Sequence, residues 1–212
     1  MGAEKSKKKR SLILVISVIA LVVVASAIIL GTGAKDNPID LEIPIRSKGS
    51  ADAIVVLEEY ADYGCITCRV WHQMGIVDQI LEEYDGLVRF DWYDFPVITS
   101  DSPMAAEAGL CAHEEGMFWE YHDLVYKNYP LISEEHLKQY AAEIGLNSQE
   151  FAKCLDSGKY QPVVKEEINT GHRLGLRSTP SFRINETILI GLPTYDILAA
   201  TIDEVLEENQ SK

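Results

Sequence analysis

The chain has few basic residues outside its first ten positions, and it lacks the glycine-rich motifs of nucleotide-binding proteins. Five of its 19 Lys and Arg residues lie within residues 1–10, whereas residues 35–212 hold 14 basic and 32 acidic residues, a net charge of −18. A surface of that charge repels a polyphosphate, so we expect no nucleic-acid binding by this part of the chain. Because neither a GxGxxG segment nor a P-loop occurs, we also expect no nucleotide cofactor.

Internal repeats and low-complexity tracts are absent as well. With 14 Gly and 8 Pro in 212 residues, the chain is neither collagen-like nor Pro-rich. Its 47% hydrophobic and 25% charged residues exclude a disordered chain. The length is sufficient for one compact domain with additional segments.

A long apolar run follows the basic amino terminus. Residues 11–30 carry no charge, and as a helix they would span roughly 30 Å, the thickness of a bilayer core. The basic residues before the run predict a cytosolic segment at 1–10, a single transmembrane signal anchor at 11–33, and a body on the extracytoplasmic side of the cell membrane. The alternative is a cleaved signal peptide ending near Ala25-Ser26-Ala27, although the apolar run continues beyond that site.

The remainder of the chain predicts an α/β domain over residues 51–212, reached by a polar linker at 34–50. Hydrophobic spacing predicts strands at 53–59 and 87–93 separated by a helix over 65–83, which is a βαβ unit. A block of helices follows over about 102–176. Two short strands at 181–184 and 187–190, joined by a tight turn, and a helix over 194–208 complete a ββα unit.

Two cysteines lie at the predicted junction of the first strand and its helix, in Cys65-Ile66-Thr67-Cys68. Free amide N–H groups in the first turn of a helix stabilise an anion, so we expect Cys65 to be an exposed thiol with a lowered pKa. Cys68, one helical turn further, is placed to attack a mixed disulfide formed at Cys65. The pattern therefore predicts a redox-active pair.

Two other interpretations of the CxxC pair remain open. It could be half of a zinc site, but this needs two further ligands at matching spacing, and Cys111 with His113 is the only other cluster in the sequence. It could also be an inert structural disulfide. We expect no bound metal.

The other two cysteines, Cys111 and Cys154, are 43 positions apart. If Cys65 pairs with Cys68, these two remain to form a bond that ties two helices together, as an oxidising compartment allows. The alternative is two buried free thiols.

Glu59 and His72 flank the CxxC pair in the sequence. Alternation along the strand places Glu59 on the same face as Val55 and Leu57, where a buried carboxyl would have a raised pKa and could accept the Cys68 proton through a water. The alternative is a solvated acid at the end of the strand. His72 is two turns after Cys65, where it could bias the thiolate weakly or be an ordinary surface or core histidine.

Several motifs in a fixed order resemble one known family. They are Glu59-Tyr60-Ala61-Asp62-Tyr63 before the CxxC pair, Ala105-Ala106-Glu107-Ala108 before Cys111, residues 116–124 (GMFWEYHDL), Tyr140-Ala141 before Gly145-Leu146, Phe151 with Cys154-Leu155, and residues 175–182 (GLRSTPSF) with Ile184-Asn185. Over roughly residues 45–206 the chain resembles the thioredoxin-fold disulfide oxidoreductases typified by DsbA, in particular the membrane-tethered members from bacteria.

The resemblance implies a thioredoxin-like fold with a helical insertion. Cys65 would then be the nucleophile and Cys68 the resolving cysteine. Pro180 would be cis and face the pair, with the Thr179 backbone available to a substrate strand. Some relatives have a structural disulfide where Cys111 and Cys154 stand. The residues Ile66 and Thr67 depart from the family, in which proline and an aromatic or histidine are common at these positions and tune the redox potential.

Together these observations predict an extracytoplasmic enzyme that forms disulfides in exported client proteins, and a quinone-linked membrane partner that reoxidises it. One alternative is a reductase or isomerase kept reduced by a membrane electron carrier. Another is a tethered binding module without catalytic activity.

Overall fold

A computed structural model describes residues 43–210 of the chain. The predicted transmembrane segment at 11–33 and most of the predicted linker lie outside these residues. Within 43–210, none of the helices combines the length and the apolar character that crossing a membrane requires.

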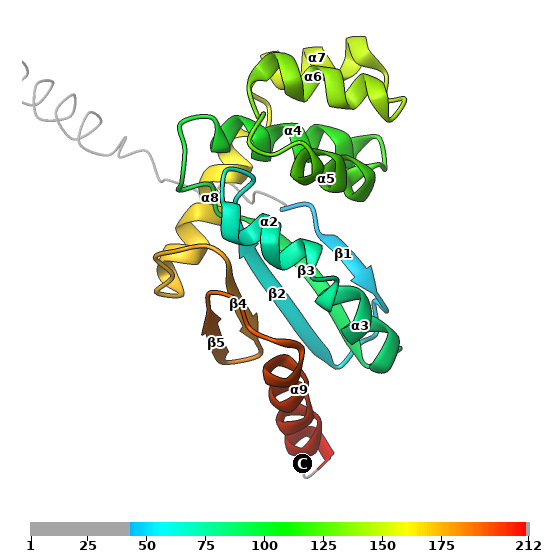
Figure 1. The fold of residues 1–212 in the computed structure, drawn as a ribbon, viewed down its shortest axis with the longest axis vertical. Helices are drawn as coiled ribbons and strands as arrows, with labels where there is room; N and C mark the ends of the chain where they lie inside the picture. Colours follow the sequence, from blue (N-terminus) through cyan, green and yellow to red (C-terminus); the bar gives the residue numbers. More distant parts are fainter. Residues whose placement is uncertain (1–42, 211–212) are drawn as a thin grey trace, which may run out of the picture. The chain divides into compact units, whose positions relative to one another are not determined.

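A five-stranded mixed sheet forms the centre of the described part (Figure 1). Its order is β1-β3-β2-β4-β5, where the strands are β1 (Arg46–Gly49), β2 (Val55–Ala61), β3 (Val88–Asp94), β4 (Ser181–Ile184) and β5 (Thr187–Ile190). β2 and β3 are parallel and the other neighbours are antiparallel. The predicted βαβ and ββα units are therefore present, and the first strand lies two residues later than the sequence pattern placed it.

Strand β1 corrects the predicted boundary of the linker. Residues 34–50 were expected to be a tether, but Arg46–Gly49 pairs antiparallel with β3. The cause is Arg46, whose buried guanidinium lies 3.2 Å from Asp94 Oδ2 and 2.7 Å from Glu167 Oε1. A polar composition predicts a linker, but these two long-range ion pairs hold the segment in the sheet.

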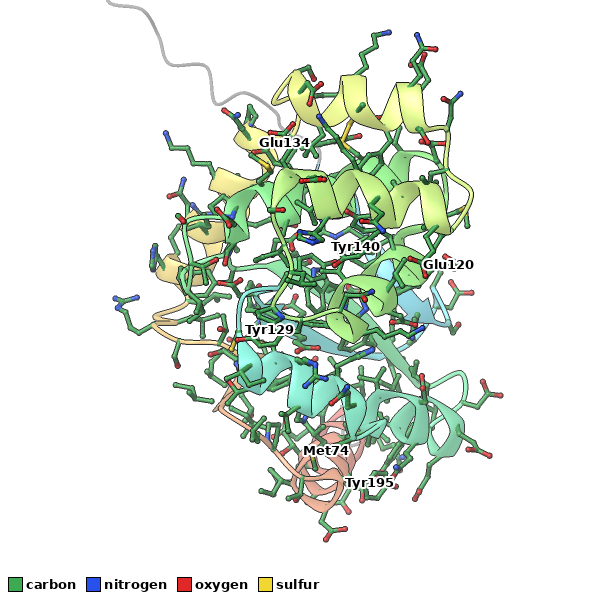
Figure 2. All side chains as sticks on the ribbon, turned by 45° about the horizontal axis from the view of Figure 1, so that its top comes forward. Met74, Glu120, Tyr129, Glu134, Tyr140 and Tyr195 are labelled. Carbon is green, nitrogen blue, oxygen red and sulfur yellow. A yellow bond between two sulfur atoms is a disulfide. The ribbon has the colours of Figure 1, made fainter. Side chains whose placement is uncertain are left out.

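The helix expected over residues 65–83 is interrupted. The structure has two helices, α2 (Ile66–Gln73) and α3 (Ile76–Glu83). Gly75, between them, has a φ of +66°, a left-handed conformation that glycine adopts without a steric penalty. Both helices contribute to the apolar cluster on one face of the sheet, together with α9 (Tyr195–Gln210). Figure 2 shows Met74, at the end of α2, and Tyr195, at the start of α9, on the same side of the molecule.

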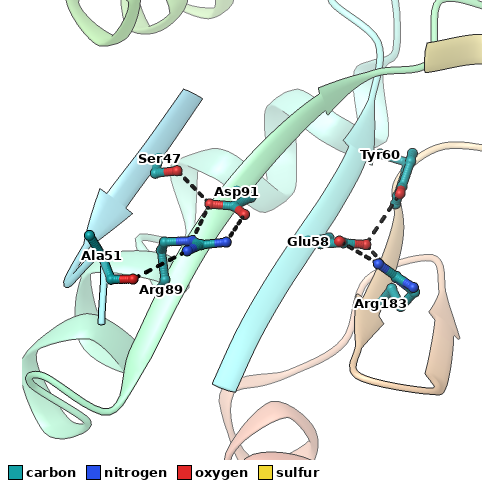
Figure 3. Close-up of polar contacts among 7 residues, drawn as sticks. All are labelled: Ser47, Ala51, Glu58, Tyr60, Arg89, Asp91 and Arg183. Carbon is teal, nitrogen blue, oxygen red and sulfur yellow. Dashed lines mark hydrogen bonds and ion pairs between the residues drawn. The ribbon is translucent and has the colours of Figure 1, made fainter. Parts of the chain in front are cut away.

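The opposite face of the sheet carries charged side chains along β2, β3 and β4 (Figure 3). Glu58 accepts two hydrogen bonds from Arg183, its cross-strand neighbour. Asp91 is paired with Arg89 and accepts from the Ser47 hydroxyl at 2.5 Å. Each carboxylate thus has an arginine partner, which balances the charge of this face.

The helical block lies between β3 and β4 in the sequence, as predicted. Its helices are α4 (Ser102–Glu114), α5 (Phe118–Lys127), α6 (Glu134–Glu143), α7 (Ser148–Asp156) and α8 (Gln161–Arg173). In Figure 1, α4 to α7 are grouped beyond one end of the sheet, away from α9. Cys65 and Cys68 belong to the apolar cluster of this block, so the CxxC pair lies where the block meets the sheet.

Cys111 in α4 and Cys154 in α7 are bonded to each other, with Cα atoms 6.0 Å apart. The alternative interpretation, two free thiols at these positions, is therefore wrong. Cys65 and Cys68 are the two free cysteines among the described residues.

Replacing both Cys111 and Cys154 with serine should lower the free energy of unfolding by about 2–4 kcal/mol, because the bond closes a loop of 43 residues and restricts the unfolded chain. Urea unfolding of the oxidised proteins measures this difference. An unchanged free energy of unfolding would show that the bond does not stabilise the block.

Candidate active site

The loop before α2 is fixed by the buried carboxylate of Asp62. One of its oxygens accepts from the Gly64 amide at 2.7 Å, and the other accepts from the amides of Val97 and Ile98, each at 2.8 Å. Gly64 approaches the neighbouring loop closely, since a Cβ there would lie 2.5 Å from the Ser102 hydroxyl oxygen. These contacts determine where the chain enters α2.

Cys65 is the residue that precedes the first turn of α2. Its backbone is extended, with φ −95° and ψ 116°, and its sulfur accepts from the Cys68 amide at 3.4 Å. The Thr67 hydroxyl lies 2.9 Å from the same sulfur. An N-cap side chain that accepts from the amides of the first turn is the arrangement that favours an anion.

These contacts lower the pKa of Cys65 to about 5. The largest contribution is a hydrogen bond from the Cys68 thiol, and burial opposes it. The side chains of Thr179 and Thr67 and the Cys68 amide lower the pKa further. The Thr179 carbonyl lies 3.5 Å from the sulfur and can accept only from the protonated thiol. At neutral pH the reduced protein therefore holds Cys65 as a thiolate.

One expectation about Cys65 is wrong. Only 4% of the residue is exposed, whereas we expected an exposed thiol. The Thr67 side chain and the Thr179 carbonyl both lie against the sulfur, and the Thr67 hydroxyl oxygen is 3.3 Å from the carbonyl oxygen. A reaction partner must therefore reach the sulfur past these two residues, next to Ile66, which is 47% exposed.

Cys68 is fully buried in the next turn of α2. Burial raises the pKa of its thiol well above the ordinary value, and its hydrogen bond to Cys65 and the nearby Glu59 carboxyl raise it further. The two cysteines thus have pKa values displaced in opposite directions. Cys65 therefore favours the thiolate form, and Cys68 favours the protonated thiol.

Glu59 is buried on the face of β2 that packs against α2. Of the two alternatives considered for Glu59, a buried carboxyl and a solvated acid at the end of the strand, the structure has the first. Glu59 is 3% exposed, and its cross-strand neighbours are Trp92 and Phe182. Burial, followed by the negative charge of Cys65, raises the pKa of Glu59 well above the ordinary value. Its Oε1 atom has no hydrogen-bond partner among the described residues.

The Thr179–Pro180 peptide bond is cis. Pro180 immediately precedes β4, and the Thr179 carbonyl lies 3.5 Å from the Cys65 sulfur. The structure therefore brings Glu59, Cys65, Cys68, Thr179 and Pro180 together, whereas the Cys111–Cys154 bond lies within the helical block.

His72 does not hydrogen-bond Cys65 in the structure. Its ring lies 4.7 Å from that of His122, and its Nε2 lies 3.3 Å from Asp123 Oδ1. Within residues 43–210, these three side chains form the one group with atoms close enough to hold a metal ion, all within 4.8 Å of one another. The CxxC pair is not part of it.

Sequence reasoning missed the role of Thr67, which it treated only as a departure from the family pattern. A hydroxyl two residues after a cysteine at a helix start is within reach of the thiolate, and this proximity was the available signal. It also missed His122 and Asp123, which only the packing of α5 against α2 brings near the site.

Replacing Thr67 with valine should raise the pKa of Cys65 by about 1 unit, because valine keeps the shape of threonine and removes a hydrogen bond to the charged sulfur. Thiolate absorbance of the reduced protein across pH measures this value.

Thr67→Ser is the matched control, since it keeps the hydroxyl and should leave the pKa of Cys65 near that of the unchanged protein. Equal pKa values in the valine and serine variants would contradict the assigned hydrogen bond.

Comparisons with known proteins agree with this geometry. The family model described as "Thioredoxin" matches residues 44–204. A probable disulfide bond formation protein D from Bacillus anthracis is 27% identical over 222 residues, which cover 97% of this chain and 100% of that protein. The structure of oxidised BdbD from Bacillus subtilis has a TM-score of 0.70 at 22% identity and covers 76% of this chain and 92% of that one, which supports the fold.

A longer relative contains a similar segment. The Na(+)/H(+) antiporter NhaA of Herminiimonas arsenicoxydans is 31% identical over 185 residues, which are 85% of this chain but 29% of the antiporter. The present chain thus spans less than a third of that protein. Because the family model covers most of the described residues and the disulfide bond formation protein is matched along its full length, the chain belongs to the thioredoxin family, as a DsbA-like thiol–disulfide oxidoreductase.

Proposed function

We propose that the chain forms disulfide bonds in exported client proteins through its Cys65–Cys68 pair. The observation that carries this proposal is the Cys65 sulfur at the start of α2, with hydrogen bonds that lower the pKa of the thiol to about 5. A stabilised thiolate stabilises the reduced enzyme, and a stable reduced form makes the oxidised form a stronger oxidant. This favours the oxidase direction over a reductase or isomerase.

The reaction begins with the oxidised pair. A client thiolate attacks the Cys65 sulfur, the Cys65–Cys68 bond breaks, and the electron pair goes to the Cys68 sulfur. Glu59, protonated because burial raises its pKa, donates a proton to Cys68. The result is a mixed disulfide between the client and Cys65.

A second client thiolate then attacks the client sulfur of this mixed disulfide, and Cys65 departs as a thiolate. The client gains one disulfide, and the enzyme pair receives the two electrons. A sulfur with a low pKa leaves faster, so the hydrogen bonds to Cys65 also accelerate this step. The Thr179 backbone, next to the cis Pro180, faces the sulfur from the side on which an extended client segment would lie.

The location and the redox partner are part of the same proposal. The uncharged run at residues 11–30 after a basic segment supports a membrane anchor with the catalytic domain on the extracytoplasmic side. The Cys111–Cys154 bond supports an oxidising compartment. We assign reoxidation of the Cys65–Cys68 pair to a quinone-linked membrane partner.

In the Cys68→Ala variant, the Cys65 thiolate should attack a disulfide of a client protein and form a mixed disulfide, with the other client sulfur as the leaving thiolate. The adduct should persist in cells, because the residue that would release the client is gone. Non-reducing gel electrophoresis and mass spectrometry of the captured protein detect these adducts, and the trapped clients should be exported proteins.

The matched control is the Cys65→Ala, Cys68→Ala double variant, which should trap no client. If the Cys68→Ala protein folds and yields no adduct, the proposed catalytic role is wrong. Adducts with cytosolic proteins only would contradict the proposed location.

A further inference from the structure

Glu59 and His122 both line one small cavity. Its volume is about 20 Å³, and its lining includes Glu59 from β2, His72 from α2 and His122 from α5. A cavity of this volume holds one water molecule when polar groups line it.

Two of the lining side chains have a buried polar atom without a partner. Oε1 of Glu59 and Nε2 of His122 are inaccessible to solvent and make no hydrogen bond to any residue within 43–210. Both residues are almost completely buried, at 3% and 2% exposure. Leaving two such atoms unpaired is costly, and one water that bonds to both would satisfy them.

The other nitrogen of His122 leads towards solvent. Its Nδ1 lies 2.9 Å from Oδ1 of Asp123, a residue whose side chain is 53% exposed, and His72 Nε2 lies 3.3 Å from the same oxygen. Hydrogen bonds from the two histidines lower the pKa of Asp123 against the opposing effect of partial burial, and burial lowers the pKa of His122 to about 4. At neutral pH, Asp123 is therefore ionised and His122 neutral. Nδ1 then carries the hydrogen that Asp123 accepts, and Nε2 is a free acceptor that faces the cavity.

Resting on the proposed function, we propose that His122 and Asp123 are positioning residues that carry protons between Glu59 and solvent through one water in this cavity. Before Cys68 becomes a nucleophile, Glu59 releases its proton through the water to His122 Nε2, while the Nδ1 proton goes to Asp123 and leaves. The ionised Glu59 then accepts the proton of Cys68. When Glu59 has given its proton to Cys68, the same chain runs in reverse.

Outward and inward proton transfer alternate, because each one leaves the His122 ring in the state from which the other starts. An outward transfer leaves the hydrogen on Nε2, which is the state from which an inward transfer starts, and an inward transfer restores Nδ1–H. One catalytic cycle requires one transfer in each direction, so the imidazole returns to its initial state.

A charged pair, Lys48 and Asp78, also lines the cavity. Lys48 of β1 lies 3.7 Å from Asp78 of α3, and its ammonium lies 4.7 Å from the centre of the Trp119 ring. Tyr126, Cys65 and Cys68 are the other titratable groups close to Glu59. An ammonium group has donors only, whereas a neutral imidazole has both a donor and an acceptor, so His122 is the group suited to relay a proton.

The test follows the reduced protein as it reacts with oxidised glutathione, in the presence of a chelator because His72, His122 and Asp123 could hold a metal ion. In the first step, Cys65 attacks glutathione disulfide and forms a mixed disulfide. In the second, Cys68 resolves it and closes the Cys65–Cys68 bond. Rapid acid quenching with mass spectrometry gives both rate constants.

Replacing His122 with phenylalanine keeps an aromatic ring in the core and removes both nitrogens. We expect the second step to slow by roughly tenfold or more, because proton transfer to the base is impaired, and the first step to change by less than about twofold. In this variant, the second step should accelerate with buffer concentration, since an external base replaces the relay. Asp123→Asn serves as a second test if the phenylalanine variant does not fold, because the Asp123 side chain is more exposed than that of His122. This variant should slow the second step in the same way.

The double variant Glu59→Gln, His122→Phe separates a relay from structural damage. If His122 acts through Glu59, the double variant resolves at the rate of Glu59→Gln alone, whereas independent damage multiplies the two effects. The control is His136→Phe in α6, where His136 bonds to Ser133 at 2.7 Å and not to the cavity; it should resolve at the rate of the unchanged protein.

The results distinguish the two proposals. If the unchanged protein forms no mixed disulfide with glutathione, the proposed function fails. If it reacts normally and folded His122 and Asp123 variants resolve at its rate, or if the effects of Glu59→Gln and His122→Phe multiply, the relay is overturned and the proposed function stands.

Discussion

The structure depends on the hydrogen bonds that converge on one sulfur atom at the start of α2. The Cys68 thiol and amide and the Thr67 hydroxyl all favour the ionised form of Cys65. They succeed although the residue is almost completely covered, and burial by itself would raise the pKa of a thiol. The loop held by Asp62 determines where the chain enters α2 and so places Cys65 for these contacts.

The second requirement is a buried acid close to the second cysteine. Glu59 and Cys68 share an apolar environment that raises the pKa of both groups, so neither ionises easily without the other. Because both groups are sealed from solvent, exchange with bulk water needs a polar path, and the cavity beside His122 is located where that path is needed.

Much of the fold could be predicted from the sequence because the local signals were strong. Both strands of the β4–β5 hairpin begin and end where the pattern placed them, with Asn185 at a φ of 51° in the turn. β1 could not be predicted, because its place in the sheet rests on the contact of Arg46 with Glu167, 121 residues away. The break in the first long helix depends on the left-handed conformation of Gly75, which a periodic apolar pattern does not reveal.

The candidate site was predictable to a similar degree. Cys65, Cys68 and Glu59 adjoin one another through a single strand–helix junction, so local sequence was enough to group them. Other features of the site arise only when distant segments pack together. Thr179 joins Thr67 in covering Cys65, and His72 contacts His122.

The most direct test of the central claim, a thiolate of Cys65 stabilised at the start of α2, is the equilibrium potential of the Cys65–Cys68 couple against glutathione at neutral pH. A thiol pKa of about 5, where thioredoxin has about 7, stabilises the reduced form and predicts a potential roughly 50 mV above the value of about −270 mV for thioredoxin. A potential at or below that of thioredoxin would contradict the account.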